Sequence, residues 1–170
     1  MNEPEPHSNN DKSSSRMSRF GFRKPRIYPP VWLALSLLAM FGFDRFLPVM
    51  EFSFAGASVA AWSLFGVGAG MVLVAAGGFR KVDTGVVPFS KSTALVTGGI
   101  YRVTRNPMYL GMALVLAGVA IKLGALSAWI PIPVFMVIIQ KQFIENEEIF
   151  LTAIYGDDYR DYCRRVRRWI

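Results

Sequence analysis

Two short polar stretches adjoin apolar runs, and their residue types could bind a charged ligand. In the first, Asn106 and Pro107 stand at the start of the apolar run 110–139. Proline restricts the residue before it and suits the first helical position, while asparagine suits the cap, so a helix should begin here. The N–H groups and positive dipole end of this helix, with Arg105 beside them, could hold a carboxylate or a phosphate.

The second stretch is the acidic pair Glu147 and Glu148, close to the end of the same apolar region. Neighbouring helical residues point about 100° apart, so the two carboxylates cannot face one pocket equally. Ile144 and Leu151 fall on the side of Glu147, which predicts that Glu147 points inward and that Glu148 lies nearer Arg105 or solvent. A ligand with both a carboxylate and a cation would fit the two stretches together. The alternatives are a plain interfacial helix cap and a solvated helix start.

Composition places these stretches in a membrane protein. The chain has 170 residues, enough for one domain, of which 52% are hydrophobic and 18% charged. Its formal net charge of +7 comes from Lys and Arg that flank apolar runs, so we expect contact with the lipid bilayer and no nucleic-acid binding. With His7 as the one histidine and Cys163 as the one cysteine, we expect no metal site.

The pattern of apolar runs predicts an all-α fold, a polytopic membrane helical bundle. We expect a disordered basic N-terminal tail, residues 1–28, before a single membrane domain, residues 29–170. Within that domain we expect spans at 30–47, 55–79, 107–123 and 125–144, a loop at 80–106 and an amphipathic C-terminal segment at 145–170. The spacing of Gly66 and Gly70 predicts close helix packing, and the Arg-rich side of the tail favours a helix on the membrane surface.

Orientation follows from the Lys and Arg residues. Of the 19, all but Arg45 and Lys122 fall in the N-terminal tail, in the middle loop or from Lys141 onward. Because cytoplasmic loops of membrane proteins are enriched in Lys and Arg, we expect a multi-pass protein of the inner (cytoplasmic) membrane with both termini cytoplasmic.

The two stretches also carry a resemblance. The run ALVTGGIYRVTRNPMYLG, followed by EEIFLTAIYGDDYRDYCRRVRRW, resembles the isoprenylcysteine carboxyl methyltransferase family, especially its short bacterial membrane members. The C-terminal pattern is shared more loosely with phospholipid N-methyltransferases and membrane sterol reductases. The resemblance implies an S-adenosylmethionine-dependent methyltransferase with a cytoplasm-facing cofactor pocket roofed by the C-terminal segment. Its acceptor would be lipid-like or a small hydrophobic molecule carrying a carboxylate, a thiol or an amine.

The resemblance and the two stretches together give the cofactor-binding residues that we expect. These are Thr93, Ala94, Leu95, Val96, Tyr101, Arg105, Asn106, Pro107, Met108, Tyr109, Glu147 and Glu148. Family members with isoprenylated substrates carry an Arg four residues before the first Glu; Phe143 stands there in this chain, which argues against an isoprenylcysteine carboxylate as acceptor. We assign no catalytic base, because methyl transfer from a sulfonium depends mainly on alignment.

Two other functions are alternatives to this one. The first is a non-enzymatic membrane assembly or scaffold protein. The second is a reductase like the membrane sterol reductases, which are much longer proteins.

The distribution of Lys and Arg makes a prediction about topology. Reporter fusions after Phe79 and after Ile170 should report cytoplasm, and a fusion near Lys122 should report the opposite side. A periplasmic C-terminus would contradict the expected site, because it would separate the C-terminal segment from the cytoplasmic cofactor.

Overall fold

Helices make up every regular element in the part of the chain that the computed structural model describes, residues 27–81 and 95–170. The predicted all-α class is therefore confirmed for these residues. In chain order they are α2 (Pro29–Phe46), α3 (Ala57–Lys81), the 3-10 helix η1 (Gly99–Arg102), α4 (Pro107–Leu123), the 3-10 helix η2 (Leu126–Trp129), α5 (Pro131–Ile139), the π-helix η3 (Gln140–Ile144), α6 (Glu145–Tyr155) and α7 (Asp157–Arg165).

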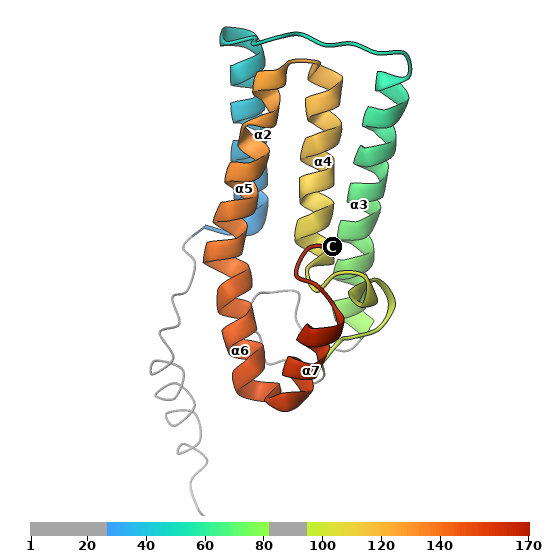
Figure 1. Cartoon of the computed structure of the whole chain (residues 1–170), viewed down its shortest axis with the longest axis vertical. Helices are drawn as coiled ribbons and strands as arrows, with labels where there is room; N and C mark the ends of the chain where they lie inside the picture. Colours follow the sequence, from blue (N-terminus) through green and yellow to red (C-terminus); the bar gives the residue numbers. More distant parts are fainter. Residues whose placement is uncertain (1–26, 82–94) are drawn as a thin grey trace, which may run out of the picture.

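The long helices form a bundle with an extension at one end. Figure 1 shows α2, α3, α4 and α5 running side by side. At the end of α5 the chain continues through η3 into α6, which projects beyond the bundle, and α7 then turns back toward the start of α4 (Figure 1). Residues 1–26 of the predicted tail 1–28, and residues 82–94 of the predicted loop 80–106, lie outside the described residues.

Proline and glycine set several helix boundaries. Pro29, Pro107 and Pro131 each stand in the first turn of a helix, where the missing N–H breaks no intrahelical hydrogen bond. The helix predicted to begin at Pro107 does begin there. It ends at Gly124, whose φ of 75° is a left-handed conformation that glycine adopts without strain.

Helices α3 and α4 pack closely along an antiparallel seam of small residues. A Cβ atom added to Gly68 would lie 2.5 Å from the carbonyl oxygen of Gly111, and one added to Gly118 would lie 2.7 Å from that of Ala61. Backbones this close leave no room for a side chain at those glycines. The seam therefore fixes the position of α4, and with it the start of α4 where the polar residues gather.

The prediction for Gly66 and Gly70 is wrong. A Cβ atom added to either residue would meet nothing within 4 Å. Gly68 lies between them in sequence but on another side of the helix, and that side faces α4. The small-residue spacing was real, but spacing alone did not determine which side of α3 packs against its neighbour.

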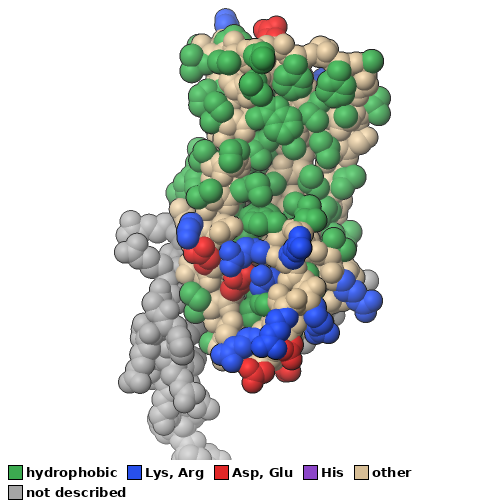
Figure 2. All heavy atoms as spheres, in the orientation of Figure 1, with side chains coloured by type: hydrophobic (Ala, Val, Ile, Leu, Met, Phe, Trp, Pro, Cys, Tyr) green, Lys and Arg blue, Asp and Glu red, His purple; other side chains and the backbone are tan. Residues whose placement is uncertain are grey.

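Among the residues that the structure describes, two helical stretches are long and apolar enough to cross a membrane. They are Ala57–Gly77, with a mean hydropathy of 2.0, and Leu126–Tyr155, with a mean hydropathy of 1.4. Helix α4 is apolar but has only 17 residues, about 26 Å against a hydrocarbon core of about 30 Å, so the four-span arrangement stays a prediction. Figure 2 shows hydrophobic side chains over the bundle and charged side chains gathered at the end that carries α6 and α7.

The glycine seam predicts opposite effects for two neighbouring substitutions. Gly68→Ala should lower the unfolding temperature of the detergent-purified protein, because its methyl group would collide with the backbone of α4. Gly66→Ala should leave that temperature unchanged or raise it, since the site is open and alanine favours a helix by about 1 kcal/mol over glycine. Equal shifts in the two variants would show that the seam does not hold the helices together.

Candidate functional site

A small cavity lies where the loop before α4, the start of α4, and helices α6 and α7 meet. Its volume is about 100 Å³. It is lined by Leu95, Val96, Tyr101, Arg105, Asn106, Glu147, Glu148, Leu151, Tyr159 and Tyr162. Both stretches singled out in the sequence contribute to this lining, through Arg105 and Asn106 and through Glu147 and Glu148. Folding therefore brings the stretches together although about 40 residues separate them.

Glu147 lines this cavity and its carboxylate turns inward toward α4, as the helix geometry predicted. The hydroxyl of Tyr109 donates a hydrogen bond to Oε1 of Glu147 across 2.9 Å, which links α4 to α6. Tyr109 is buried, and its ring lies 6.3 Å from that of the fully buried Phe143. A carboxylate in such surroundings needs hydrogen-bond donors, and Tyr109 supplies one of them.

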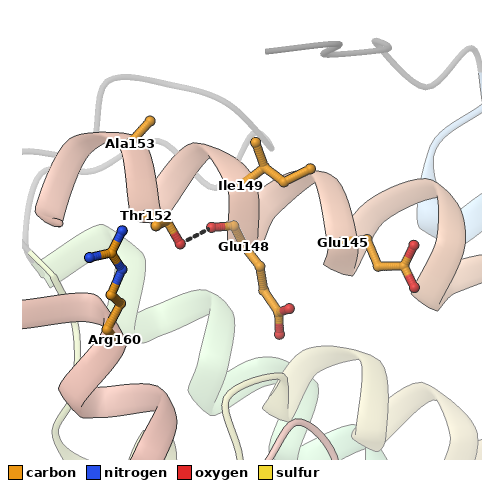
Figure 3. A pocket seen from close by; sticks show the side chains of 6 residues that line it. All are labelled: Glu145, Glu148, Ile149, Thr152, Ala153 and Arg160. Atoms are coloured by element: carbon orange, nitrogen blue, oxygen red, sulfur yellow. Dashed lines mark hydrogen bonds between the residues drawn. The ribbon is translucent and has the colours of Figure 1, made fainter. Parts of the chain in front are cut away.

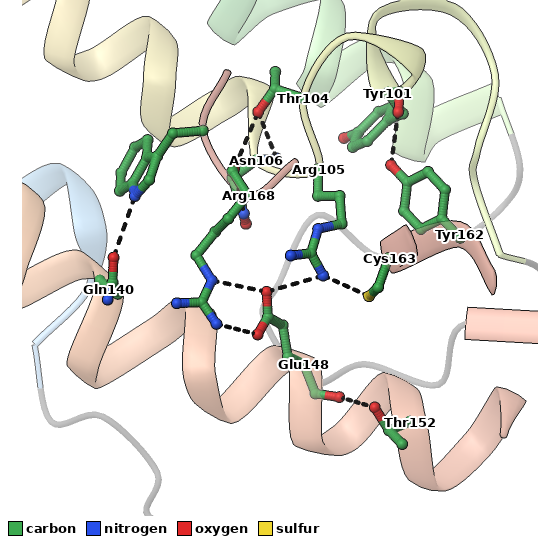
Figure 4. Close-up of polar contacts among 11 residues, drawn as sticks. Tyr101, Thr104, Arg105, Asn106, Gln140, Glu148, Thr152, Tyr162, Cys163 and Arg168 are labelled. Carbon is green, nitrogen blue, oxygen red and sulfur yellow. Dashed lines mark hydrogen bonds and ion pairs between the residues drawn. The ribbon is translucent and has the colours of Figure 1, made fainter. Parts of the chain in front are cut away.

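Glu148 points to another side of α6 and binds two arginines (Figure 4). Arg168 forms a two-pronged pair with its carboxylate, through Nε at 3.0 Å and Nη2 at 2.6 Å. Nη1 of Arg105 lies 3.2 Å from Oε1 and also donates to Sγ of Cys163. The predicted closeness of Glu148 to Arg105 is confirmed. The hydrogen bond to Glu148 raises the pKa of Arg168, so the Arg168 guanidinium keeps its charge.

The side chain of Asn106 has a different role from the one expected. Asn106 stands at the cap position of α4, but its side chain makes no capping hydrogen bond. Its Nδ2 instead donates to the carbonyl oxygen of Arg168 at 2.9 Å, and the Thr104 hydroxyl donates to the same oxygen at 3.2 Å. The polar start of α4 therefore binds the C-terminal end of the chain.

Helix α7 closes the cavity with tyrosines. The hydroxyl of Tyr162 donates to the carbonyl oxygen of Tyr101 at 2.7 Å, and the rings of Tyr159 and Tyr162 lie 6.1 Å apart. Burial raises the pKa of Tyr162 to about 12, and it also raises the pKa of Tyr159, so both hydroxyls keep their protons at neutral pH.

The expectation of a C-terminal helix lying on the membrane surface needs correction. The apolar side of α7 packs against Leu95, Leu151 and Tyr155 of the same chain. That side is therefore covered by protein and cannot face lipid. The amphipathic pattern correctly predicts a helix with one apolar side. Such a side can pack against the membrane or against the protein itself, and the pattern does not distinguish the two.

Comparison with known proteins identifies the family. The family described as phospholipid methyltransferase matches residues 56–158, more than half of the chain. The protein belongs to the phospholipid methyltransferase family. The matched range contains the α3–α4 seam, the start of α4 and the acidic pair, but it ends before Arg168.

Two relatives of this family member are informative. An uncharacterized protein of Haemophilus influenzae is 38% identical over 63 residues, which are 37% of this chain and 100% of the relative. Protein-S-isoprenylcysteine O-methyltransferase of Schizosaccharomyces pombe is 32% identical over 80 residues, which are 45% of this chain and 33% of the yeast protein. The match thus spans about a third of the yeast protein's length. No solved structure matches the chain.

The other expected site residues of this phospholipid methyltransferase family member fall into three groups. Tyr109 reaches the cavity through its bond to Glu147, while Pro107 and Met108 start α4 without lining the cavity. Thr93 and Ala94 lie outside the described residues. Sequence reasoning missed four residues of the site. Leu151, Tyr159 and Tyr162 belong to the apolar side of the amphipathic C-terminal segment, which is the signal that could have found them. Arg168 is one arginine in a run of arginines, and no signal distinguishes it.

A second hollow lies along α6, in the direction of Arg160 of α7 (Figure 3). It is wider, about 620 Å³, and is lined by Glu145, Glu148, Ile149, Thr152, Ala153 and Arg160. Glu148 borders both hollows, so its ion pairs with Arg105 and Arg168 stand between the cavity and this groove.

The bond between Tyr109 and Glu147 makes a prediction about stability. Tyr109→Phe should lower the free energy of unfolding by about 1–3 kcal/mol, because it leaves the Glu147 carboxylate without its donor. Tyr28→Phe is the matched control, because Tyr28 is exposed. Adding Glu147→Gln to Tyr109→Phe should recover part of the loss, and strictly additive effects in thermal unfolding would show that the two side chains are not coupled.

Proposed function

We propose that this protein is an S-adenosylmethionine-dependent methyltransferase of the inner membrane. In this proposal the chain crosses the membrane several times with both termini in the cytoplasm, and the cavity at the end of α4 binds the cofactor at the cytoplasmic face. The methyl acceptor is lipid-like or a small hydrophobic molecule. Family membership supports methyl transfer in general, and the remaining points rest on the chemistry of the cavity.

The observation that carries the proposal is the pairing of an inward-facing carboxylate with aromatic rings. Glu147 borders the cavity beside Tyr101, Tyr159 and Tyr162. Aromatic faces and a carboxylate both stabilise a cation that has been removed from water. S-adenosylmethionine carries two cationic groups, a sulfonium and an amine, so the carboxylate and the aromatic rings of the cavity suit this cofactor.

The size of the cavity sets a condition on this proposal. Sites for cofactors and drug-sized ligands usually measure about 300–1,000 Å³, whereas this cavity measures about 100 Å³. It can enclose one end of the cofactor but not the whole molecule, so binding requires the walls to separate. A non-enzymatic assembly protein would also be expected to have a contracted cavity, and cofactor titration distinguishes the two functions.

The chain's own residues have separate tasks in the reaction. The bound cofactor supplies a methyl group on a positively charged sulfur, and transfer to the acceptor leaves a neutral thioether. Glu147 holds the positive end, and Tyr109 fixes the Glu147 carboxylate through its hydroxyl. The buried rings of Tyr159 and Tyr162 exclude water from the cavity.

The surroundings of Phe143 bear on the acceptor. Phe143 is fully buried against Tyr109, at the position where relatives with isoprenylated substrates carry an arginine. This position offers no cation to a carboxylate acceptor. The apolar surface of the bundle instead suits an acceptor that arrives through the bilayer, with a carboxylate, a thiol or an amine as its nucleophile.

The two glutamates predict unequal effects on cofactor affinity. Glu147→Gln should weaken S-adenosylmethionine binding more than tenfold, which corresponds to about 1.4 kcal/mol, a reasonable size for one charge-assisted hydrogen bond. Glu148→Gln should not weaken binding, because the Glu148 carboxylate binds Arg105 and Arg168 rather than the cofactor.

Calorimetric titration of the detergent-purified variants measures both affinities. Small and equal effects would mean that the acidic pair is a solvated helix start. A wild-type protein that binds no S-adenosylmethionine would favour the assembly protein.

A further inference from the structure

The segment that follows α7 belongs to no helix and is attached to three separate elements. We call residues 166–170 the strap; Val166 begins it in an extended conformation. The carbonyl oxygen of Arg167 accepts a hydrogen bond from the backbone N–H of Arg105 at 3.0 Å. With the bonds from Thr104 and Asn106 to the carbonyl oxygen of Arg168, this contact attaches the strap to the start of α4.

Two side chains attach the strap to the continuous helix formed by η3 and α6. The guanidinium of Arg168 binds the Glu148 carboxylate on α6. Nε1 of Trp169 donates to Oε1 of Gln140 at 3.2 Å, and the Trp169 ring packs against the bundle core. Gln140 begins the π-helix η3, a rare element that often occurs at functional sites.

These attachments join the walls of the contracted cavity. The start of α4, α6 and α7 each contribute lining residues, and the strap continues directly from α7 while binding the other two. We propose that the strap is an autoinhibitory latch: its backbone binds the start of α4, its Arg168–Glu148 ion pair binds α6, and the cavity reaches cofactor size only when this pair separates. The inference rests on the proposed function, because the cofactor sets the volume required.

The ion pair is suited to separate reversibly. The Arg168 side chain is 32% exposed and that of Glu148 is 19% exposed, so water can solvate both groups when they part. Glu148 also keeps Arg105 as a partner at 3.2 Å, which avoids leaving a buried carboxylate unpaired. The apparent affinity of a ligand falls with the fraction of protein in the competent state. Breaking the latch therefore raises cofactor affinity, whereas removing a ligand contact lowers it.

The chain contains its own reporter for this separation. Cys163 is the one cysteine, and its Sγ accepts a hydrogen bond from Arg105 between α7 and the start of α4. Cys163 is half-buried, and when these walls part its thiol becomes more accessible to an uncharged maleimide. The labelling rate of Cys163 in the full-length protein therefore reports opening without any added ligand.

Three variants isolate the latch. Arg168→Gln removes the pair with Glu148, and Arg168→Lys keeps the charge. Arg167→Gln is the matched control, because it removes the same charge from an adjacent, exposed side chain.

The experiment measures Cys163 labelling and S-adenosylmethionine binding for each variant. We expect Arg168→Gln to label about fivefold faster or more than wild type, to bind S-adenosylmethionine more tightly and to associate with it faster. We expect Arg167→Gln to match wild type and Arg168→Lys to restore most of the wild-type rate. Unchanged labelling in Arg168→Gln would overturn the latch, and so would faster labelling combined with weaker cofactor binding. Faster labelling in a protein that binds no S-adenosylmethionine would support the latch and reject the proposed cofactor.

Discussion

The hydrogen bond between Tyr109 and Glu147 is the contact on which the site depends. It joins α4, whose position is fixed by the glycine seam with α3, to α6, which projects from the bundle. The contact turns one carboxylate of the acidic pair inward and leaves the other, Glu148, to bind Arg105 and Arg168. Two adjacent glutamates thereby take different roles, because a helix separates neighbouring side chains by about 100°.

Local rules predicted the elements that depend on local chemistry. Asn106 and Pro107 predicted the start of α4, since proline acts on its own backbone and on the residue before it. The inward direction of Glu147 followed from the apolar residues on the same side of its helix. In both cases the residues that determine the structure lie within two helical turns of Pro107 or of Glu147.

Long-range contacts could not be predicted in this way. The choice of Gly68 over Gly66 depends on which side of α3 faces α4, and helix spacing leaves that open. The partners of Asn106 and Glu148 lie 62 and 20 residues away, in a strap whose sequence shows only a run of arginines. The amphipathic pattern of α7 likewise gave its apolar side but not the protein surface that covers it.

The contracted cavity and the strap belong to one physical account. The cavity is lined by tyrosines and a carboxylate and measures about 100 Å³. In the proposed account this lining favours a cation, and the attachments of the strap keep the cavity smaller than a nucleoside cofactor. Within this account, the apolar outer surface of the bundle serves the acceptor and the charged end serves the cofactor (Figure 2).

Transfer of a labelled methyl group tests the central claim most directly. Membranes containing the protein would be incubated with methyl-labelled S-adenosylmethionine, and the organic extract would be counted against membranes containing the Glu147→Gln variant. The account predicts label in a membrane-soluble product of the wild-type protein and a strongly reduced amount with the variant. Equal label in the two extracts, or none above membranes lacking the protein, would contradict it.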